Sequence, residues 1–107
     1  MNNDFVNNNI PFVVLNENEV KILNKYNDNL LYKYFIYIKY FCGYAKQKNI
    51  QQNFTAKQFL EYCGYSTNSG DYISRIATFN GYLSNNGLIK INKIYDELGH
   101  KRNIYSI

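Results

Sequence analysis

Side chains that could catalyse a reaction or bind a metal ion are few in this sequence of 107 residues. It contains one histidine, His100, and two cysteines, Cys42 and Cys63. These three side chains are too few for an ordinary structural zinc site. The sequence also lacks carboxylate pairs at a useful spacing, a glycine-rich phosphate loop, and a Ser or Cys beside a base. We therefore expect no enzymatic activity, no metal and no cofactor.

Positively charged side chains gather instead near the C-terminal end of the chain. They are Lys90, Lys93, Lys101 and Arg102, with His100 beside them. Asp96 and Glu97 offset part of this charge. The net charge of the whole chain, +4, decides little by itself. Because phosphate groups are bound mainly by Lys and Arg, the local excess of cations favours a nucleic-acid partner.

Some of these cations have a second interpretation. Lys90 and Lys93 could be edge-strand charges that prevent aggregation. His100 fits a turn residue better than a residue that reads bases. These alternatives stay open at the level of sequence.

The N-terminal half of the chain predicts a tail, a short strand and a helix. Residues 1–10 are polar, and we expect a disordered tail there, with one folded domain over residues 11–107. The run from Phe12 to Leu15 is β-like. Asn16 can cap a helix that ends at the Asn-Asp-Asn cluster of residues 27–29.

Residues 30–48 form the longest expected helix. Apolar residues at steps of three and four mark the side that faces the core; they are Leu31, Tyr34, Phe35, Ile38, Phe41, Cys42 and Ala45. Tyr37, Tyr40 and Tyr44 lie off that side. They fit either the rim of the core or a surface for a homodimer or another partner.

The cysteines and the N-terminus indicate the compartment. Both cysteines fall in helix-like apolar segments, and residues 1–9 lack the apolar core of a signal peptide. We therefore expect reduced, buried thiols in a cytoplasmic protein. The most apolar stretch, residues 30–45, is interrupted by Lys33 and Lys39, so no membrane span is expected.

The C-terminal half predicts two helices and a hairpin. Thr55 can cap the first helix and Gly64 can end it, while Gly87 can stop the second. The expected elements are helices over residues 56–63 and 71–85, a strand over 88–95, a turn over 96–99 and a return strand over 102–107. The predicted fold class is mainly α with a small β-hairpin (α+β).

The helix over residues 71–85 is expected to bury one side and expose the other. The inward positions are Ile73, Ile76, Ala77, Asn80 and Leu83. The outward positions are Ser69, Asp71, Ser74, Arg75, Thr78 and Tyr82.

Two segments together resemble a known family. Residues 54–66, Phe-Thr-Ala-Lys-Gln-Phe-Leu-Glu-Tyr-Cys-Gly-Tyr-Ser, are similar to the first half of a helix-turn-helix. Residues 82–89, Tyr-Leu-Ser-Asn-Asn-Gly-Leu-Ile, are similar to the junction between a recognition helix and a wing hairpin. In series, and followed by a hairpin with Gly99 at its tip, they resemble winged helix-turn-helix DNA-binding domains. Residues 30–48 would then be the supporting helix.

The resemblance implies that the second helix enters the major groove and that the hairpin contacts DNA beside it. The DNA-binding residues would be Ser69, Ser74, Arg75, Thr78, Lys90, Lys93, His100, Lys101 and Arg102. One feature departs from the family pattern, because the recognition helix carries a single cation, Arg75. We therefore expect the basic wing to supply an unusually large share of the binding.

The order of elements is also similar to winged-helix domains of plasmid and phage replication initiators and to small relaxosome accessory proteins of conjugative plasmids. This resemblance implies sequence-specific binding of double-stranded DNA at an origin of transfer or replication of a mobile element. Other replication or relaxosome proteins would then be further partners. Two alternatives stay open: a small transcriptional regulator, and a winged-helix module that binds another protein.

Overall fold

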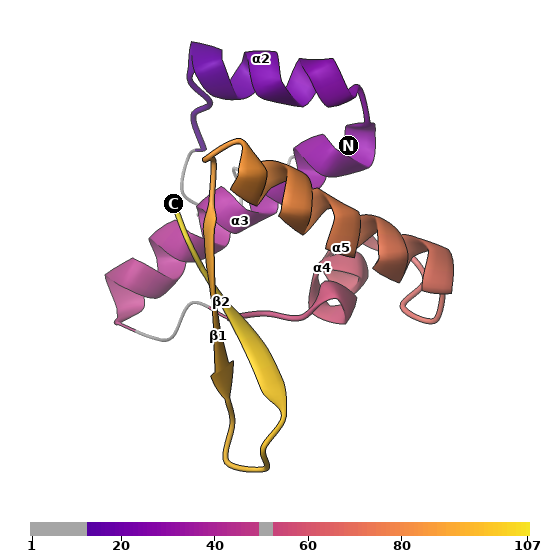
Figure 1. Ribbon diagram of the computed structural model, residues 1–107, viewed down its shortest axis with the longest axis vertical. Coiled ribbons are helices and arrows are strands. Elements are labelled where there is room, and N and C mark those ends of the chain that lie inside the picture. The colour runs from indigo at the N-terminus through magenta and orange to yellow at the C-terminus, as the bar shows by residue number, and fades with distance from the viewer. Residues whose placement is uncertain (1–12, 50–52) are drawn as a thin grey trace. The chain divides into compact units, whose positions relative to one another are not determined.

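Helices make up most of the chain in the computed structural model, which describes residues 13–49 and 53–107 (Figure 1). The chain divides into two compact units, residues 1–50 and residues 51–107. The second unit ends in a two-stranded antiparallel hairpin, so the predicted α+β class is confirmed. The tail predicted over residues 1–10 lies outside the described residues. The single domain over residues 11–107 stays a prediction.

The first helix described, α2 (Glu17–Tyr26), begins at the predicted cap. Asn16 Oδ1 accepts a hydrogen bond from the Glu19 backbone N–H at 2.8 Å, and Glu19 Oε1 accepts one from the Asn16 N–H at 2.9 Å. This reciprocal pair satisfies two N–H groups that have no partner within the helix. The helix ends at Asn27, whose φ of 60° places it in the left-handed region.

The strand predicted over residues 12–15 is wrong where the structure describes it. Phe12 lies outside the described residues, and residues 13–15 belong to no strand. A β-strand needs a neighbouring strand to bind its backbone groups. Here the Val14 carbonyl accepts a hydrogen bond from Lys39 Nζ at 2.9 Å, so a side chain replaces a strand partner at this position.

The long helix α3 (Asn29–Lys48) confirms the prediction for residues 30–48. Its buried residues are Leu30, Leu31, Tyr34, Phe35, Ile38, Cys42 and Ala45. Phe41, also predicted for the core, is half-buried and stacks on Tyr37 at 6.2 Å between ring centroids. Tyr40 and Tyr44 stack at 6.1 Å. These tyrosines lie off the buried face as predicted, while their role in an interface stays a prediction.

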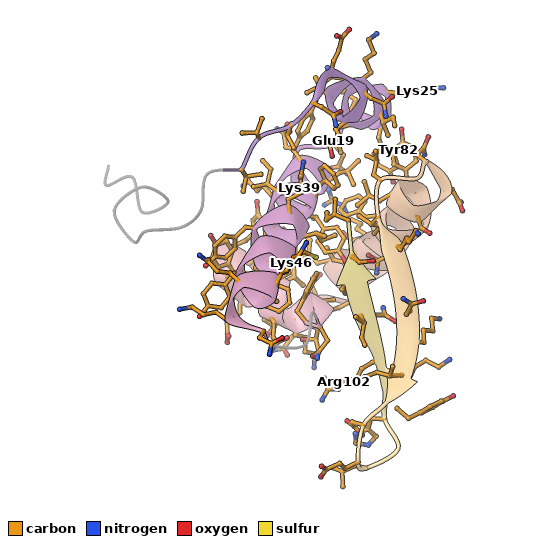
Figure 2. All side chains as sticks on the ribbon, turned by 90° about the vertical axis from the view of Figure 1, so that its left-hand side faces the viewer. Glu19, Lys25, Lys39, Lys46, Tyr82 and Arg102 are labelled. Carbon is orange, nitrogen blue, oxygen red and sulfur yellow. The ribbon has the colours of Figure 1, made fainter. Side chains whose placement is uncertain are left out.

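A buried ion pair joins α2 to α3 (Figure 2). Lys39 Nζ lies 3.0 Å from Glu19 Oε1 and 3.1 Å from Glu19 Oε2. The Glu19 side chain is only 7% exposed and the Lys39 side chain 21%. Burying a carboxylate away from water costs free energy unless a counter-charge is present. The ion pair with Lys39 offsets this cost for Glu19, which also caps α2.

In the second unit, α4 (Ala56–Cys63) has the predicted ends. Thr55 Oγ1 accepts a hydrogen bond from the Gln58 N–H at 3.1 Å, and Gln58 Oε1 accepts one from the Thr55 N–H at 2.7 Å. Gly64 closes the helix with a φ of 80°, which a residue without a Cβ adopts readily. Phe59 and Leu60 are buried as expected.

The next helix, α5 (Gly70–Asn85), buries a row of side chains that matches the predicted one in part. Ile73 and Asn80, both expected to face inward, are half-buried. Ile76 and Leu83 are buried as expected, but Phe79 is buried with them and Ala77 is exposed. Residues 76, 79 and 83 recur at helical spacing. Burying a Phe ring removes far more apolar surface from water than burying an Ala methyl, so the row that contains Phe79 turns inward.

The hairpin consists of β1 (Lys90–Tyr95) and β2 (Lys101–Ser106), close to the predicted limits. Lys90 pairs with Ser106, and Tyr95 pairs with Lys101. An isolated antiparallel bridge between Asn53 and Ile104 connects the segment before α4 to β2.

Candidate nucleic-acid interface

The register of the hairpin sorts its cations onto two faces. Successive side chains of a strand alternate between faces, and directly paired residues share one. Since Lys93 pairs with Asn103 and Tyr95 pairs with Lys101, Lys93 and Lys101 share a face. Lys90 and Arg102, which pairs with Ile94, alternate onto the opposite face.

The face with Lys93 and Lys101 borders a groove that it forms with α5 and residues 54–56. From α5, the groove is lined by Ile73, Ile76, Ala77 and Asn80. From the hairpin, it is lined by Lys93, Lys101, Arg102, Asn103 and Tyr105. Hairpin residues that were predicted to bind DNA therefore lie beside the helix that was predicted to read it.

Tyr105 anchors the inner end of the hairpin. Its side chain is buried and stacks on Phe54 at 4.3 Å between ring centroids. Its hydroxyl oxygen accepts hydrogen bonds from Asn80 Nδ2 and from Asn103 Nδ2, each at 3.3 Å. Because Asn80 belongs to α5, its bond ties the groove-facing side of the hairpin to that helix, while the bond from Asn103 lies within β2.

The cations of the hairpin differ in their partners. Lys93 and Lys101 are exposed, and neither forms an ion pair with any residue that the structure describes. Arg102, toward the turn end of the hairpin (Figure 2), places its Nε 3.4 Å from Asp96 Oδ2. His100 Nδ1 lies 3.8 Å from the same oxygen. Asp96 thus offsets Arg102, whereas Lys93 and Lys101 are available to a polyanion.

Asp96 also organises the turn between the strands. Its Oδ1 accepts hydrogen bonds from the His100 N–H at 2.8 Å and from the Leu98 N–H at 3.0 Å. The bond from the His100 N–H is the main cause that lowers the pKa of Asp96, and Arg102 lowers it further. The carboxylate is therefore the favoured form of this side chain.

The exposed side of α5 carries part of the predicted set. Ser74 and Thr78 are exposed, and Thr78 Oγ1 donates a hydrogen bond to the Ser74 carbonyl at 3.2 Å. Ser69 is half-buried and caps the helix, with its Oγ accepting a hydrogen bond from the Tyr72 N–H at 3.3 Å. Ser69 thus has a structural role that its assignment to DNA binding did not include.

Arg75, predicted to point outward from α5, lies beside two aromatic rings, and its contact with DNA stays a prediction. Its guanidinium carbon lies 5.8 Å from the centroid of the Tyr72 ring and 5.9 Å from that of the Phe79 ring. Residues three and four positions apart are neighbours on a helix surface, so the burial of Phe79 draws Arg75 toward the aromatic side. The cation lies within cation–π range of both rings and is half-buried.

Two exposed apolar residues near the turn were not among the predicted site residues. Leu98 is 80% exposed and Tyr95 is 69% exposed. The sequence held a signal for Leu98, because an apolar residue in a short polar turn has little means of reaching a core.

Neither a metal centre nor a membrane span emerges from the described residues. Within residues 13–49 and 53–107, no three His, Cys, Asp or Glu side chains gather closely enough to hold a metal ion. None of the helices in those ranges combines the length and apolar character required to cross a membrane. Neither Cys42 nor Cys63 forms a disulfide. Cys42 is buried as expected, and this burial raises its pKa to about 11, whereas Cys63 is only half-buried, so the expectation of a buried thiol is wrong there. No protein-family model, curated protein or solved structure matches this chain.

Proposed function

We propose that residues 53–107 form a winged helix-turn-helix unit that binds double-stranded DNA and catalyses no reaction. In this proposal, α5 is the recognition helix and the β1–β2 hairpin is the wing. The order of α4, α5 and hairpin supports it. The connection between the helices, residues 64–69, is longer than the turn of about three or four residues in the simplest helix-turn-helix.

The observation that carries the proposal is the placement of Lys93 and Lys101 on the groove-facing side of the hairpin. The register makes them diagonal neighbours, with side chains about 7–8 Å apart at their bases. Two exposed cations at this separation can contact neighbouring phosphates of one DNA strand. The exposed side of α5, with Ser74 and Thr78, would then face the base edges.

The salt dependence of binding tests this arrangement. Fluorescence anisotropy with a labelled random-sequence duplex gives the slope of log affinity against log salt. Lys93→Gln and Lys101→Gln should each reduce that slope by about one unit, because each removes a phosphate contact.

Lys90→Gln is the matched control, since it removes the same charge from the opposite face of the same hairpin. It should leave the slope close to that of the parent. A slope that falls equally for all three variants would show that the hairpin acts only through its total charge. No binding to any duplex would reject the proposed function.

The role at an origin of transfer or replication rests on the family resemblance and stays a prediction. Selection of bound fragments from a random DNA pool would identify the recognised sequence. A palindromic site would indicate a dimer, and direct repeats would indicate monomers bound head to tail.

A further inference from the structure

The turn of the hairpin presents a large apolar side chain to solvent. Leu98 is 80% exposed, the highest value among the large hydrophobic residues described. Figure 1 shows the hairpin extending away from α4 and α5, so that its turn stands apart from both helices. A leucine in this position gains nothing from a core. Tyr95, at the end of β1 next to the turn, is 69% exposed as well, so this end of the hairpin offers apolar surface to a ligand.

The backbone that carries Leu98 is held by a set of hydrogen bonds. Asp96 Oδ1 accepts from the Leu98 N–H at 3.0 Å and from the His100 N–H at 2.8 Å. The Asp96 N–H donates to the His100 carbonyl at 2.9 Å, and the Gly99 N–H donates to the Asp96 carbonyl at 2.9 Å. Gly99 adopts a φ of 82°, in the region that favours glycine. Leu98 is therefore presented on a preformed turn, so binding orders little additional backbone.

The charges around Leu98 suit a polyanion. Residues 93–102 contain three cations, Lys93, Lys101 and Arg102, against two acids, Asp96 and Glu97, which leaves a net charge of 3 − 2 = +1 with neutral histidine. Asp96 is engaged in the turn, while Lys93 and Lys101 are exposed. An apolar tip flanked by cations matches DNA, whose phosphates surround stacks of apolar base faces.

We propose that Leu98 is a wedge that inserts between stacked base pairs from the minor groove and kinks the duplex. This inference rests on the proposed function, since it assumes that the hairpin binds DNA. Apolar side chains inserted in this way unstack a base step and bend the duplex by about 20–90°. Flexible pyrimidine–purine steps such as TpA deform most easily, so the wedge should favour them.

End-to-end energy transfer measures the bend directly. The probe is a duplex of about 24 base pairs, a length typical of sites that proteins bend, with a central TpA step and one dye at each end. The parent protein should raise the transfer efficiency. Leu98→Ala should abolish this rise and weaken binding several-fold, yet keep the salt slope, because it removes no phosphate contact.

Leu98→Met is the matched control, because Met keeps an apolar side chain of similar volume; it should bend the duplex as the parent does. Circular dichroism should show the same helix content for all three proteins. Parent protein that binds without bending, or Leu98→Ala that bends like the parent, would overturn the wedge and leave the proposed function intact. Absence of binding to this and to random-sequence duplexes would reject both.

A basic hairpin with an exposed leucine could instead dock on an anionic membrane. Vesicles of phosphatidylserine and phosphatidylcholine, tested by co-sedimentation, distinguish the two partners. The wedge predicts that Leu98→Ala changes duplex bending and leaves vesicle binding at the parent level. Vesicle binding that depends on Leu98, with no Leu98-dependent bending of the duplex, would overturn the proposal in favour of a membrane.

Discussion

Replacing Lys39 by Met would test how the buried ion pair stabilises the N-terminal unit. Methionine keeps the apolar part of the lysine side chain and removes the ammonium group. The Glu19 carboxylate would lose the contacts at 3.0 and 3.1 Å, and the Val14 carbonyl would lose its bond at 2.9 Å. One buried charge would then lack its counter-charge.

The magnitude follows from the burial of the two side chains. Removing one partner of a fully buried ion pair lowers the free energy of unfolding by about 3–5 kcal/mol. Lys39 is 21% exposed, so water would reach part of the site. We therefore expect a loss of about 2–3 kcal/mol in the free energy of unfolding.

Urea unfolding followed by far-UV circular dichroism measures this loss, and the chain contains a matched control. Lys21 and Glu17 form an i,i+4 ion pair on α2, the helix that carries Glu19. Lys21 Nζ lies 3.2 Å from Glu17 Oε1, and the two side chains are 73% and 84% exposed. Lys21→Met should cost less than about 0.5 kcal/mol. Adding Glu19→Gln to Lys39→Met should recover part of the loss, because the unpaired charge disappears. Equal effects of Lys39→Met and Lys21→Met would refute the reasoning.

Three further predictions follow from single residues of the structure. Phe79→Ala should cost about 3–5 kcal/mol in the free energy of unfolding, and a fully stable variant would show that Phe79 is not in the core. Because burial raises the pKa of Cys42 to about 11, a thiol reagent at neutral pH should label Cys63 first, and faster labelling of Cys42 would contradict its burial. The pKa of Asp96 is lowered from 3.8 in the folded protein, so its stabilisation of the turn is present above pH 4 and is lost as the pH falls through that lowered value. The protection factors of the turn amides, which compare measured exchange with the intrinsic rate at each pH, should fall over this range, and Asp96→Asn should remove this fall.

Helix ends were predictable from sequence because each depends on residues close together in the chain. Asn16 and Thr55 each meet a Glu or Gln three residues later, and the resulting capping boxes begin α2 and α4. Gly64 ends α4 for an equally local reason. Such features require no knowledge of tertiary contacts.

The rotation of α5 was harder to predict, because its sequence contains two partly apolar rows. One row contains Ala77 and Asn80, and the other contains Phe79. The choice depends on what the rest of the unit can bury, which helical periodicity alone does not specify. The position of the Arg75 side chain depends on the same choice, because it lies beside the Phe79 ring.

The faces of the hairpin could not be derived from sequence for a related reason. The sequence predicts a return strand that begins at Arg102, whereas β2 begins at Lys101, which pairs with Tyr95. A shift of one residue in pairing would move Lys101 to the other face. Cation content was therefore visible in the sequence, but the groove that Lys93 and Lys101 share depends on a register set by the turn.

Amide NMR of the labelled protein, titrated with duplex DNA, tests most directly whether the second unit binds DNA through the hairpin and α5. We predict that the largest chemical-shift changes fall in residues 93–103 and on the exposed side of α5 around Ser74 and Thr78. Changes concentrated around Tyr37, Tyr40 and Tyr44, with residues 93–103 unaffected, would contradict that interface.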